Sequence, residues 1–370
     1  MNDRVVNFAA GPATLPLPVL EQVQRDLVSL PGIGASPLEV SHRGPWFEDV
    51  IGEAEANLRS LLTIPDSHHV VFCQGGASMQ FSMVPMNFLR GEDRAAAYVV
   101  TGSWSAKAVK EAAKEGSTRV VWTGEDDGFV RVPRDDELLA AMTDRPAYLH
   151  ITSNETIHGV EFATTPAVPP DVPLISDSSS DFLSRPVDVA VHGLLYAGAQ
   201  KNAGPAGVTI AIVRDDLLAR IPDGLPTVLD YRTYVQNGSM YNTPPVFAIY
   251  VLMLVTRWLT HEVGGLEKQL EHNREKAALV YDAIDGSNGF YRGHAEPDSR
   301  SLMNVTWRLP SEGLERRFVQ EAAAAGLVEL KGHRSVGGIR ASLYNAMPIA
   351  GAQALADFMW AFADAERTPT

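Results

Sequence analysis

Cysteine is nearly absent from this chain of 370 residues, which carries a single thiol at Cys73. One cysteine excludes an intramolecular disulfide framework and fits a reducing compartment. Long apolar runs are also missing: the longest, residues 246–255, is too short to span a bilayer, and the amino terminus lacks the apolar core of a signal peptide. We therefore expect a cytoplasmic protein without a membrane partner.

Positive charge is scarce as well. Lys and Arg number 31 against 45 Asp and Glu, which gives a formal net charge of −14 at pH 7. Such an acidic chain is a poor partner for nucleic acid or an anionic membrane. Neither a Walker A nor a GxGxxG pattern is present, so nucleotide binding gets little support, and we expect no bound metal. With 45% hydrophobic residues the chain can bury a large core, and its length favours two domains.

A lysine surrounded by small residues follows a short apolar run near the middle of the chain. The run, residues 194–199, leads to Lys201, and Gly198, Gly204 and Gly207 flank it closely. Glycines let a planar ligand approach the backbone, and a compact site behind a strand favours the neutral amine that attacks an aldehyde. The pattern is typical of a Schiff-base lysine, although a solvated lysine in a glycine turn is the alternative.

A second apolar strand, residues 172–176, ends at Asp177, which three serines follow. Pyridoxal phosphate (PLP) requires an amine for its aldehyde and a carboxylate that keeps its pyridine nitrogen protonated. Ligands of open α/β sheets bind at the carboxyl ends of the strands, where both Asp177 and Lys201 are expected. Asp177 as a helix cap or turn former remains the alternative.

Further candidate cofactor contacts follow predicted strands. Residues 69–73 lead into Gly75 and Gly76, and then into Ala77, Ser78 and a helix, an arrangement that suits one phosphate group. Two more side chains come soon after strands: Trp104 could stack on a flat heterocycle, and the hydroxyl of Thr156 could bond a phenolate oxygen. The alternatives are a core tryptophan and an ordinary threonine at a strand end.

Cations on loops and on one strand predict an anion site. His42 and Arg43 lie on a loop before an amphipathic helix, and His333 and Arg334 repeat the pair late in the chain. Two such pairs could surround a dianionic phosphate. Arg340 lies on a predicted strand, where a carboxylate of the substrate or a structural ion pair would stabilise it.

Strands and helices alternate from residue 95 to residue 214, which predicts an α/β fold. An apolar helix over 246–262 follows, and then a charged, largely exposed helix over 265–285. Strands near 303–308 and 338–343 predict a smaller α+β portion. We expect an arm over 1–15, a large domain over 16–262 and a small domain over 263–370.

The chain resembles the phosphoserine aminotransferases, class V members of the fold-type I PLP enzymes, over nearly its whole length. The resemblance implies a large domain with a mixed, mostly parallel sheet, a smaller α+β carboxyl-terminal domain and a homodimer with shared sites. It is carried by Asn7-Phe8-Ala9-Ala10-Gly11-Pro12-Ala13, Glu39-Val40-Ser41-His42-Arg43-Gly44, Tyr196-Ala197-Gly198-Ala199-Gln200-Lys201-Asn202, Asn237-Gly238-Ser239-Met240 and Tyr344-Asn345-Ala346-Met347-Pro348.

The resemblance also implies a role for each candidate. Lys201 forms the link to PLP, Asp177 pairs with the pyridinium, Trp104 stacks on the ring and Thr156 bonds the phenolate oxygen. The cofactor phosphate is expected against Ala77, Ser78 and Gln200, with Asn242 and Thr243 from the partner subunit. The expected substrate contacts are His42 and Arg43, lent across the dimer, together with His333, Arg334 and, on the α-carboxylate, Arg340.

The implied reaction is transamination from L-glutamate to 3-phosphohydroxypyruvate, which gives O-phospho-L-serine and 2-oxoglutarate. The 4-phosphohydroxythreonine step of pyridoxine biosynthesis is a further reaction of the family. Some members carry an arginine just after the glycines of the phosphate loop, whereas residues 75–79 have none here. A cysteine desulfurase, for which Cys73 would have to be mobile, and a non-catalytic PLP-binding protein are the alternatives.

Overall fold

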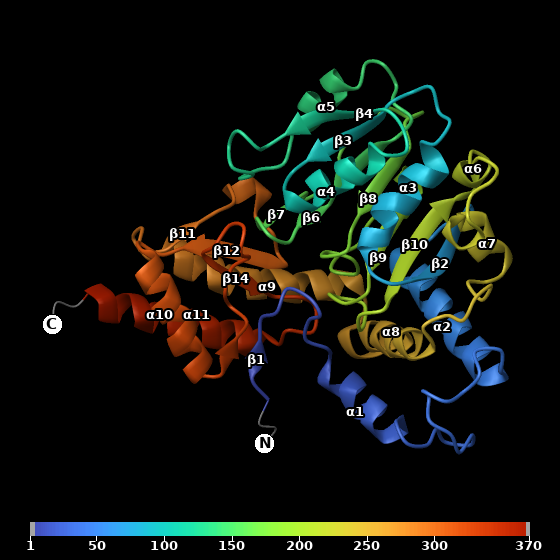
Figure 1. The fold of residues 1–370 in the computed structure, drawn as a ribbon. Helices are drawn as coiled ribbons and strands as arrows, with labels where there is room; N and C mark the ends of the chain where they lie inside the picture. Colours follow the sequence, from blue (N-terminus) through green and yellow to red (C-terminus); the bar gives the residue numbers. More distant parts are fainter. Residues whose placement is uncertain (1–3, 368–370) are drawn as a thin grey trace.

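A seven-stranded sheet forms the centre of the larger part of the molecule in a computed structural model that describes residues 4–367 (Figure 1). Only β10 runs against its neighbours in this sheet, so the sheet is mixed and mostly parallel, as predicted. The strands follow the order β2 (His68–Gln74), β10 (Val208–Arg214), β9 (His192–Gly198), β8 (Leu174–Asp177), β5 (Leu149–Thr152), β3 (Ala96–Val100) and β4 (Thr118–Thr123).

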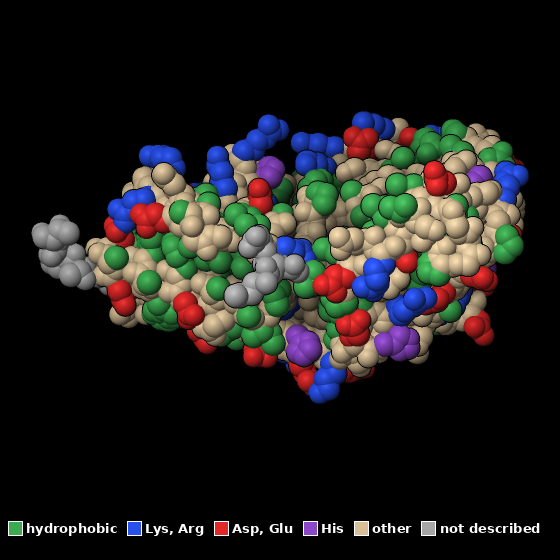
Figure 2. All heavy atoms as spheres, turned by 90° about the horizontal axis from the view of Figure 1, so that it is seen from below, with side chains coloured by type: hydrophobic (Ala, Val, Ile, Leu, Met, Phe, Trp, Pro, Cys, Tyr) green, Lys and Arg blue, Asp and Glu red, His purple; other side chains and the backbone are tan. Residues whose placement is uncertain are grey.

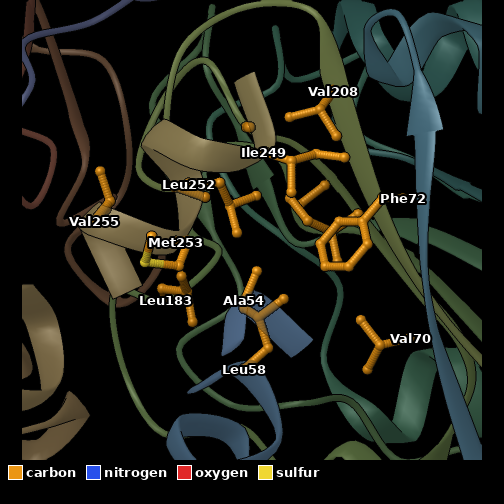
Figure 3. Packing of buried hydrophobic residues seen from close by; sticks show 14 of the residues in the cluster. Ala54, Leu58, Val70, Phe72, Leu183, Val208, Ile249, Leu252, Met253 and Val255 are labelled. Carbon is orange, nitrogen blue, oxygen red and sulfur yellow. The ribbon is translucent and has the colours of Figure 1, made fainter. Parts of the chain in front are cut away.

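Helices cover both faces of this sheet because side chains alternate along each strand. On β2, Val70 and Phe72 pack toward α2 and α8, whereas Val71 and Cys73 pack toward α3, α4 and α7 (Figure 3). The helices of this part are α1 (Leu17–Asp26), α2 (Pro45–Leu62), α3 (Gln80–Phe88), α4 (Ser103–Ala112), α5 (Asp135–Ala141), α6 (Asp215–Leu218), α7 (Tyr231–Gln236) and α8 (Val246–Trp258). Short helical turns are η1 (Ala77–Met79), η2 (Val189–Val191), η3 (Thr227–Leu229) and the π-helical η4 (Leu259–Val263).

Helix α8 is the most apolar helix of the fold and lies in the core. Together with η4 it forms the one stretch of the described residues, Val246–Val263, that is long and apolar enough to cross a membrane by length and composition, and 56% of this stretch is buried inside the molecule. Its side chains Ile249, Leu252 and Val255 are buried against α2 and the sheet (Figure 3). The apolar run thus has partners within the protein.

The carboxyl-terminal part is built on an antiparallel sheet in the order β11 (Arg292–Gly293), β12 (Asn304–Arg308) and β14 (Ile339–Ser342). Its helices are η5 (Pro297–Ser299), α9 (Leu266–Asp285), α10 (Glu312–Ala324) and α11 (Ile349–Arg367). The expectation that the first long helix is largely exposed is wrong, because nine of the twenty residues of α9 are buried. Ala277, Val280 and Ile284 recur at helical spacing and form one apolar face, while the charged residues other than the buried Lys276 lie on the exposed side.

The amino-terminal arm joins this second part. Strand β1 (Val6–Asn7) pairs in parallel with β13 (Leu327–Val328), and Phe8 is buried in the same apolar cluster as α9 and α11. The division at residue 262 stays a prediction; Leu266 still packs in the core of the larger part, and Ala277 packs in the second core. On the face seen from below, basic and acidic side chains are interspersed (Figure 2).

Candidate active site

Asp177 and Lys201 line one pocket at the carboxyl ends of β8 and β9. Asp177 ends β8 and lies in register with Tyr196 on the parallel strand β9, and Lys201 follows three residues after β9 ends at Gly198. The pocket has about 460 Å³ of empty space. Its walls consist of Gly76, Ala77, Ser78, Phe81, Trp104, Thr152, Asn154, Thr156, Asp177, Ser179, Ser180, Gln200 and Lys201.

The amine of Lys201 is held at a defined place in this pocket. Its Nζ donates a hydrogen bond to Thr156 Oγ1 at 2.6 Å. Dense packing of protein atoms around the amine lowers the pKa of Lys201 to about 8, although the negative charges of Asp177 and Glu155 oppose the shift. A neutral amine is therefore accessible close to neutral pH, as nucleophilic and general-base lysines require.

The Asp177 carboxylate is buried without an ion-pair partner among residues 4–367. Its Oδ1 accepts hydrogen bonds from Ser179 N at 3.0 Å and Ser179 Oγ at 2.6 Å. Burial raises the pKa of Asp177, and the two serine bonds and the charge of Lys201 oppose this. A carboxylate in such a place favours a cationic ligand group, and a pyridinium nitrogen is one.

Four further polar atoms of residues that line the pocket are buried without a partner in the described part of the chain: Trp104 Nε1, Thr152 Oγ1, Asn154 Oδ1 and Gln200 Oε1. The end of β9 makes room for the glutamine, since a Cβ at Gly198 would lie 2.5 Å from Gln200 Oε1. Ala77 and Ser78 begin the turn η1, directly before α3, so backbone N–H groups at a helical amino end line the same pocket. These residues fit a flat, polar cofactor that carries one phosphate.

Trp104 forms an aromatic wall of the pocket from the first turn of α4. Its ring centroid lies 5.9 Å from Lys201 Nζ and 6.5 Å from the ring centroid of Phe81. Lys107, one helical turn later, places its Nζ 4.0 Å from the centroid of the same ring. Lys107 was not predicted from the sequence, although its spacing of three residues from Trp104 on a predicted helix indicates that the two side chains are neighbours.

Arg340 lies on β14 without a carboxylate partner. No ion pair joins its guanidinium to any carboxylate of residues 4–367, and its Nε is buried without a hydrogen-bond partner. Burial lowers the pKa of Arg340. The alternative of a structural ion pair is therefore wrong, and the free guanidinium favours an anionic ligand.

His333 lies among several cations near Arg340. Its pKa is lowered first by burial and then by the charges of Arg340, Lys107 and Arg334. Its Nδ1 lies 2.7 Å from Ser335 Oγ. A group of positive side chains in a chain with a net charge of −14 indicates a local site for an anion.

Seven predicted residues do not line the pocket of Lys201 within one chain: His42, Arg43, Asn242, Thr243, His333, Arg334 and Arg340. His42 and Arg43 lie on the loop before α2, where Arg43 Nε approaches His42 Nε2 at 3.3 Å. Asn242 Nδ2 donates to Gln74 Oε1 at 3.0 Å, and Gln74 Nε2 donates to the Thr243 carbonyl at 2.6 Å. His42 and Arg43 thus lie on the loop before α2, and Asn242 and Thr243 lie on the loop before α8.

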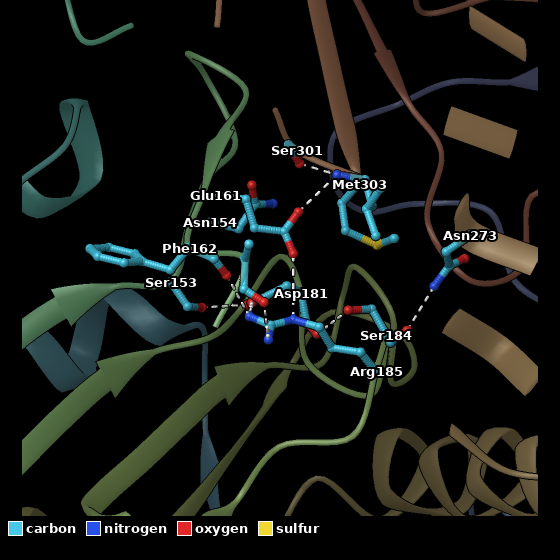
Figure 4. Close-up of polar contacts among 12 residues, drawn as sticks. Ser153, Asn154, Glu161, Phe162, Asp181, Ser184, Arg185, Asn273, Ser301 and Met303 are labelled. Atoms are coloured by element: carbon cyan, nitrogen blue, oxygen red, sulfur yellow. Dashed lines mark hydrogen bonds and ion pairs between the residues drawn. The ribbon is translucent and has the colours of Figure 1, made fainter. Parts of the chain in front are cut away.

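A buried ionic network supports the loop that follows Asp177. The Arg185 guanidinium lies 3.5 Å from Asp181 and 3.6 Å from Glu161, and it donates to the Phe162 carbonyl at 2.7 Å (Figure 4). Glu161 also accepts from Leu302 N at 2.8 Å. The loop that carries the serines of the pocket is thereby tied to the carboxyl-terminal part.

Comparisons with known proteins agree with this geometry. The family model described as aminotransferase class-V matches residues 5–355. The chain is 54% identical to the phosphoserine aminotransferase of Rhodopirellula baltica, over 98% of this chain and 96% of that protein. It is also 54% identical to the phosphoserine aminotransferase of Niallia circulans, over 97% of this chain and 98% of the relative.

Solved structures give the same result. The phosphoserine aminotransferase from Bacillus circulans subsp. alkalophilus superposes with a TM-score of 0.95 at 53% identity, covering 99% of this chain and 100% of that one. The PLP-bound phosphoserine aminotransferase from Trichomonas vaginalis superposes with a TM-score of 0.89 at 39% identity, covering 96% and 100%. The chain belongs to the class-V aminotransferase family and, within it, to the phosphoserine aminotransferases.

Proposed function

We propose that this protein transfers the amino group of L-glutamate to 3-phosphohydroxypyruvate, giving 2-oxoglutarate and O-phospho-L-serine, with PLP as cofactor. The observation that carries the proposal is the single pocket that holds both the Lys201 amine and an unpaired, buried Asp177 carboxylate. The full-length identity to phosphoserine aminotransferases supports the substrates.

The residues of the pocket have complementary tasks toward the cofactor. When bound, PLP supplies an electron sink for the charge that develops at the substrate α-carbon. Asp177 would hold the protonated pyridine nitrogen, Trp104 the ring face and Thr156 the phenolate oxygen. The residues that would hold the cofactor phosphate are Ala77, Ser78 and Gln200, together with Asn242 and Thr243 of a partner copy.

Lys201 is the residue that moves the proton. Its neutral amine takes the α-proton of the substrate, a role that the pKa of about 8 permits near physiological pH. The hydrogen bond to Thr156 fixes the direction of the amine. Arg340 binds the α-carboxylate with its planar guanidinium, which orients the α-carbon toward Lys201.

The distal phosphate of the substrate is held by His333 and Arg334 and, across a homodimer, by His42 and Arg43 of a second copy. His333 lies close to Arg340 and Lys107 of its own chain, whereas His42 and Arg43 lie outside the pocket on the loop before α2, which supports this sharing. Mixing two inactive variants tests it. Arg43→Ala and Lys201→Ala subunits, exchanged in equal amounts, should regain about a quarter of the wild-type activity, because half the dimers then carry one complete site. Without regained activity after confirmed subunit exchange, the shared site is wrong.

The visible spectrum of the holoenzyme tests the reaction itself. Addition of glutamate should remove the absorbance band of bound PLP, and 3-phosphohydroxypyruvate should restore it. The Lys110→Ala protein, changed at an exposed lysine of α4, should behave as wild type. A band that glutamate does not change would favour a non-catalytic PLP-binding protein.

A cysteine desulfurase is not supported. Cys73 is completely buried, and burial raises the pKa of its thiol to about 12, so no reactive thiolate is available near neutral pH.

We extend the proposal to a cytoplasmic location, which the lone free thiol favours, and to the 4-phosphohydroxythreonine reaction as a further activity. Turnover of that substrate by the purified protein tests the latter.

A further inference from the structure

Glu155 is a fully buried carboxylate beside the pocket, and the proposed reaction gives it no role. It lies on the short strand β6 (Asn154–Glu155), which pairs with β7 (Val160–Glu161). Its two chain neighbours, Asn154 and Thr156, both line the pocket, and Thr156 accepts the hydrogen bond from Lys201. Glu155 is therefore built into the same short segment that fixes the amine.

The carboxylate of Glu155 faces the first turn of α4. Its Oε2 accepts a hydrogen bond from Trp104 N at 3.2 Å, and its Oε1 accepts from Ser105 N at 2.9 Å and Ser105 Oγ at 2.6 Å. The N–H groups of a first helical turn have no partner within the helix, and they favour a negative charge. Glu155 thus caps α4 from a strand about fifty residues away.

At the N-cap position of α4, whose side chain usually supplies such a cap, this chain has a glycine. Gly102, at the N-cap position, has no side chain, and a Cβ there would lie 2.7 Å from Glu155 Cδ and 2.6 Å from His158 Nδ1. Ser105 Oγ accepts from Gly102 N at 3.1 Å and so completes the turn. The Glu155 carboxylate occupies the space that an N-cap side chain at position 102 would need. The first turn of α4, which carries Trp104, therefore depends on Glu155 for its cap.

Glu155 also interacts electrostatically with the reacting groups. Burial and the charge of Asp177 raise the pKa of Glu155, while the hydrogen bonds from Ser105 and Trp104 oppose that rise. Its negative charge in turn raises the pKa of Lys201 against the effect of burial.

We propose that Glu155 is a positioning residue that aims Trp104 at the cofactor ring and thereby sets how tightly the cofactor is retained. The inference rests on the proposed function, which assigns the Trp104 ring to the cofactor. If Glu155 served only as a helix cap, Glu155→Gln would lower the stability of the fold, and its effect on PLP retention would not depend on the Trp104 ring. The coupling between Glu155 and Trp104 is therefore the quantity to measure.

The experiment follows release of PLP from the purified holoenzyme by absorbance during dialysis. Glu155→Gln should weaken retention about tenfold, the usual cost of an impaired N-cap expressed as an affinity. The control is Asp26→Asn. Asp26 is a buried carboxylate of α1 that accepts hydrogen bonds from Gln22 Nε2 at 2.7 Å and from Tyr250 OH, and it does not line the pocket of Lys201. The control should retain PLP as the wild type does.

A double-mutant cycle with Trp104→Phe decides how Glu155 acts. If Glu155 works through the ring, Glu155→Gln should weaken retention much less in the Trp104→Phe protein than in the wild type. Ser105→Ala, which keeps both Glu155 and Trp104, should give a smaller loss of the same kind should Glu155→Gln fail to fold. Equal losses in both backgrounds, or retention like that of Asp26→Asn, overturn the inference. These outcomes leave the proposed function untouched, because the wild-type spectral response to glutamate is measured separately.

Discussion

Lys201 Nζ and Thr156 Oγ1 lie 2.6 Å apart, although 45 residues separate them in sequence. The bond joins the turn after β9 to the segment after β6. It holds the amine in the pocket that Asp177, the last residue of β8, also lines. Two loops of the same sheet edge therefore have to keep their relative positions for the amine to act. This relation underlies the first prediction.

Replacing Lys201 with Ala should abolish turnover of glutamate with 3-phosphohydroxypyruvate, with a loss of at least about 100-fold, because a positioned general base contributes that much or more. The free energy of unfolding should fall little or rise, since the variant also removes a partly desolvated amine. Steady-state kinetics and denaturant unfolding measure the two effects. Activity within tenfold of wild type in the purified variant would contradict the assignment of the base.

Replacing Arg340 with Gln should raise KM for glutamate about tenfold to 100-fold, the range expected when a charged hydrogen bond to a carboxylate is lost. Its stability should stay unchanged or increase, because this buried guanidinium has no carboxylate partner in the described protein. Arg292→Gln, at an exposed position of the same small sheet, is the control. An Arg340→Gln protein that unfolds more easily and binds glutamate normally would show a structural role.

Buried histidines should make part of the stability depend on pH. Burial lowers the pKa of His150 to about 3, while its value in the unfolded chain is near 6.5. The stabilisation is then present above pH 6.5 and is lost as pH falls toward 3, by about 2 kcal/mol between pH 6.5 and pH 5. Because raised carboxyl pKa values such as that of Glu161 act in the opposite direction, the test is a difference between variants.

The variant for this test is His150→Gln, which can keep a hydrogen bond to Tyr196 OH, now 2.9 Å from the histidine Nε2. Its free energy of unfolding should fall less steeply than that of the wild type as pH decreases from 6.5 to 5. His272→Gln, at an exposed site, should follow the wild-type curve. Parallel curves for wild type and His150→Gln would refute the prediction.

Lys276 should be important for stability although it does not line the pocket of Lys201. It is buried in α9 without a carboxylate partner among residues 4–367, and its Nζ donates to the carbonyls of Leu343 at 2.8 Å and Tyr344 at 2.7 Å. Lys276→Met would leave the Leu343 carbonyl unpaired, at a cost of about 1–3 kcal/mol for one buried group, whereas the Tyr344 carbonyl would keep its bond from Met347 N at 2.9 Å. Urea unfolding of this variant and of Lys268→Met, an exposed control on the same helix, measures the effect.

Lys276 should also make the free energy of unfolding depend on pH. Burial lowers the pKa of Lys276 to about 7 from 10.5, so its contribution to stability is present above pH 10.5 and is lost as pH falls through 7. In the Lys276→Met protein the dependence between pH 7 and pH 10 should be flatter than in the wild type. An identical slope in both proteins would mean that Lys276 titrates as in an unfolded chain.

The sequence could predict the part of the site that follows from strand ends. Asp177, Lys201 and Thr156 come soon after apolar runs, and the rule for open α/β sheets places such residues at one edge. Trp104 was also expected there, although it lies in the first turn of α4 rather than directly after a strand. The α/β fold was likewise predictable from alternating elements, whereas the mixed, mostly parallel sheet was implied by the resemblance to the family.

What the sequence could not predict are contacts between distant polar groups. Nothing in the local pattern connects Glu155 to Gly102, because periodicity reports which face is apolar and not which carboxylate reaches a helix end. Helix α9 was misjudged for a similar reason: Gln269, Asn273 and Lys276 are polar, yet they are buried among backbone and amide partners. Buried polar residues follow tertiary structure rather than local sequence.

The pairing of β1 with β13 has a consequence for the order in which the molecule is completed. The same arm brings Gly11 against Lys201, where a Cβ on the glycine would lie 3.3 Å from Lys201 Cγ. A ribosome releases the arm first and residues 327–328 more than three hundred residues later, so a nascent chain has its catalytic lysine long before the arm has a strand to pair with. The arm can therefore reach its place beside Lys201 only late in translation, after residues 327–328 have left the ribosome.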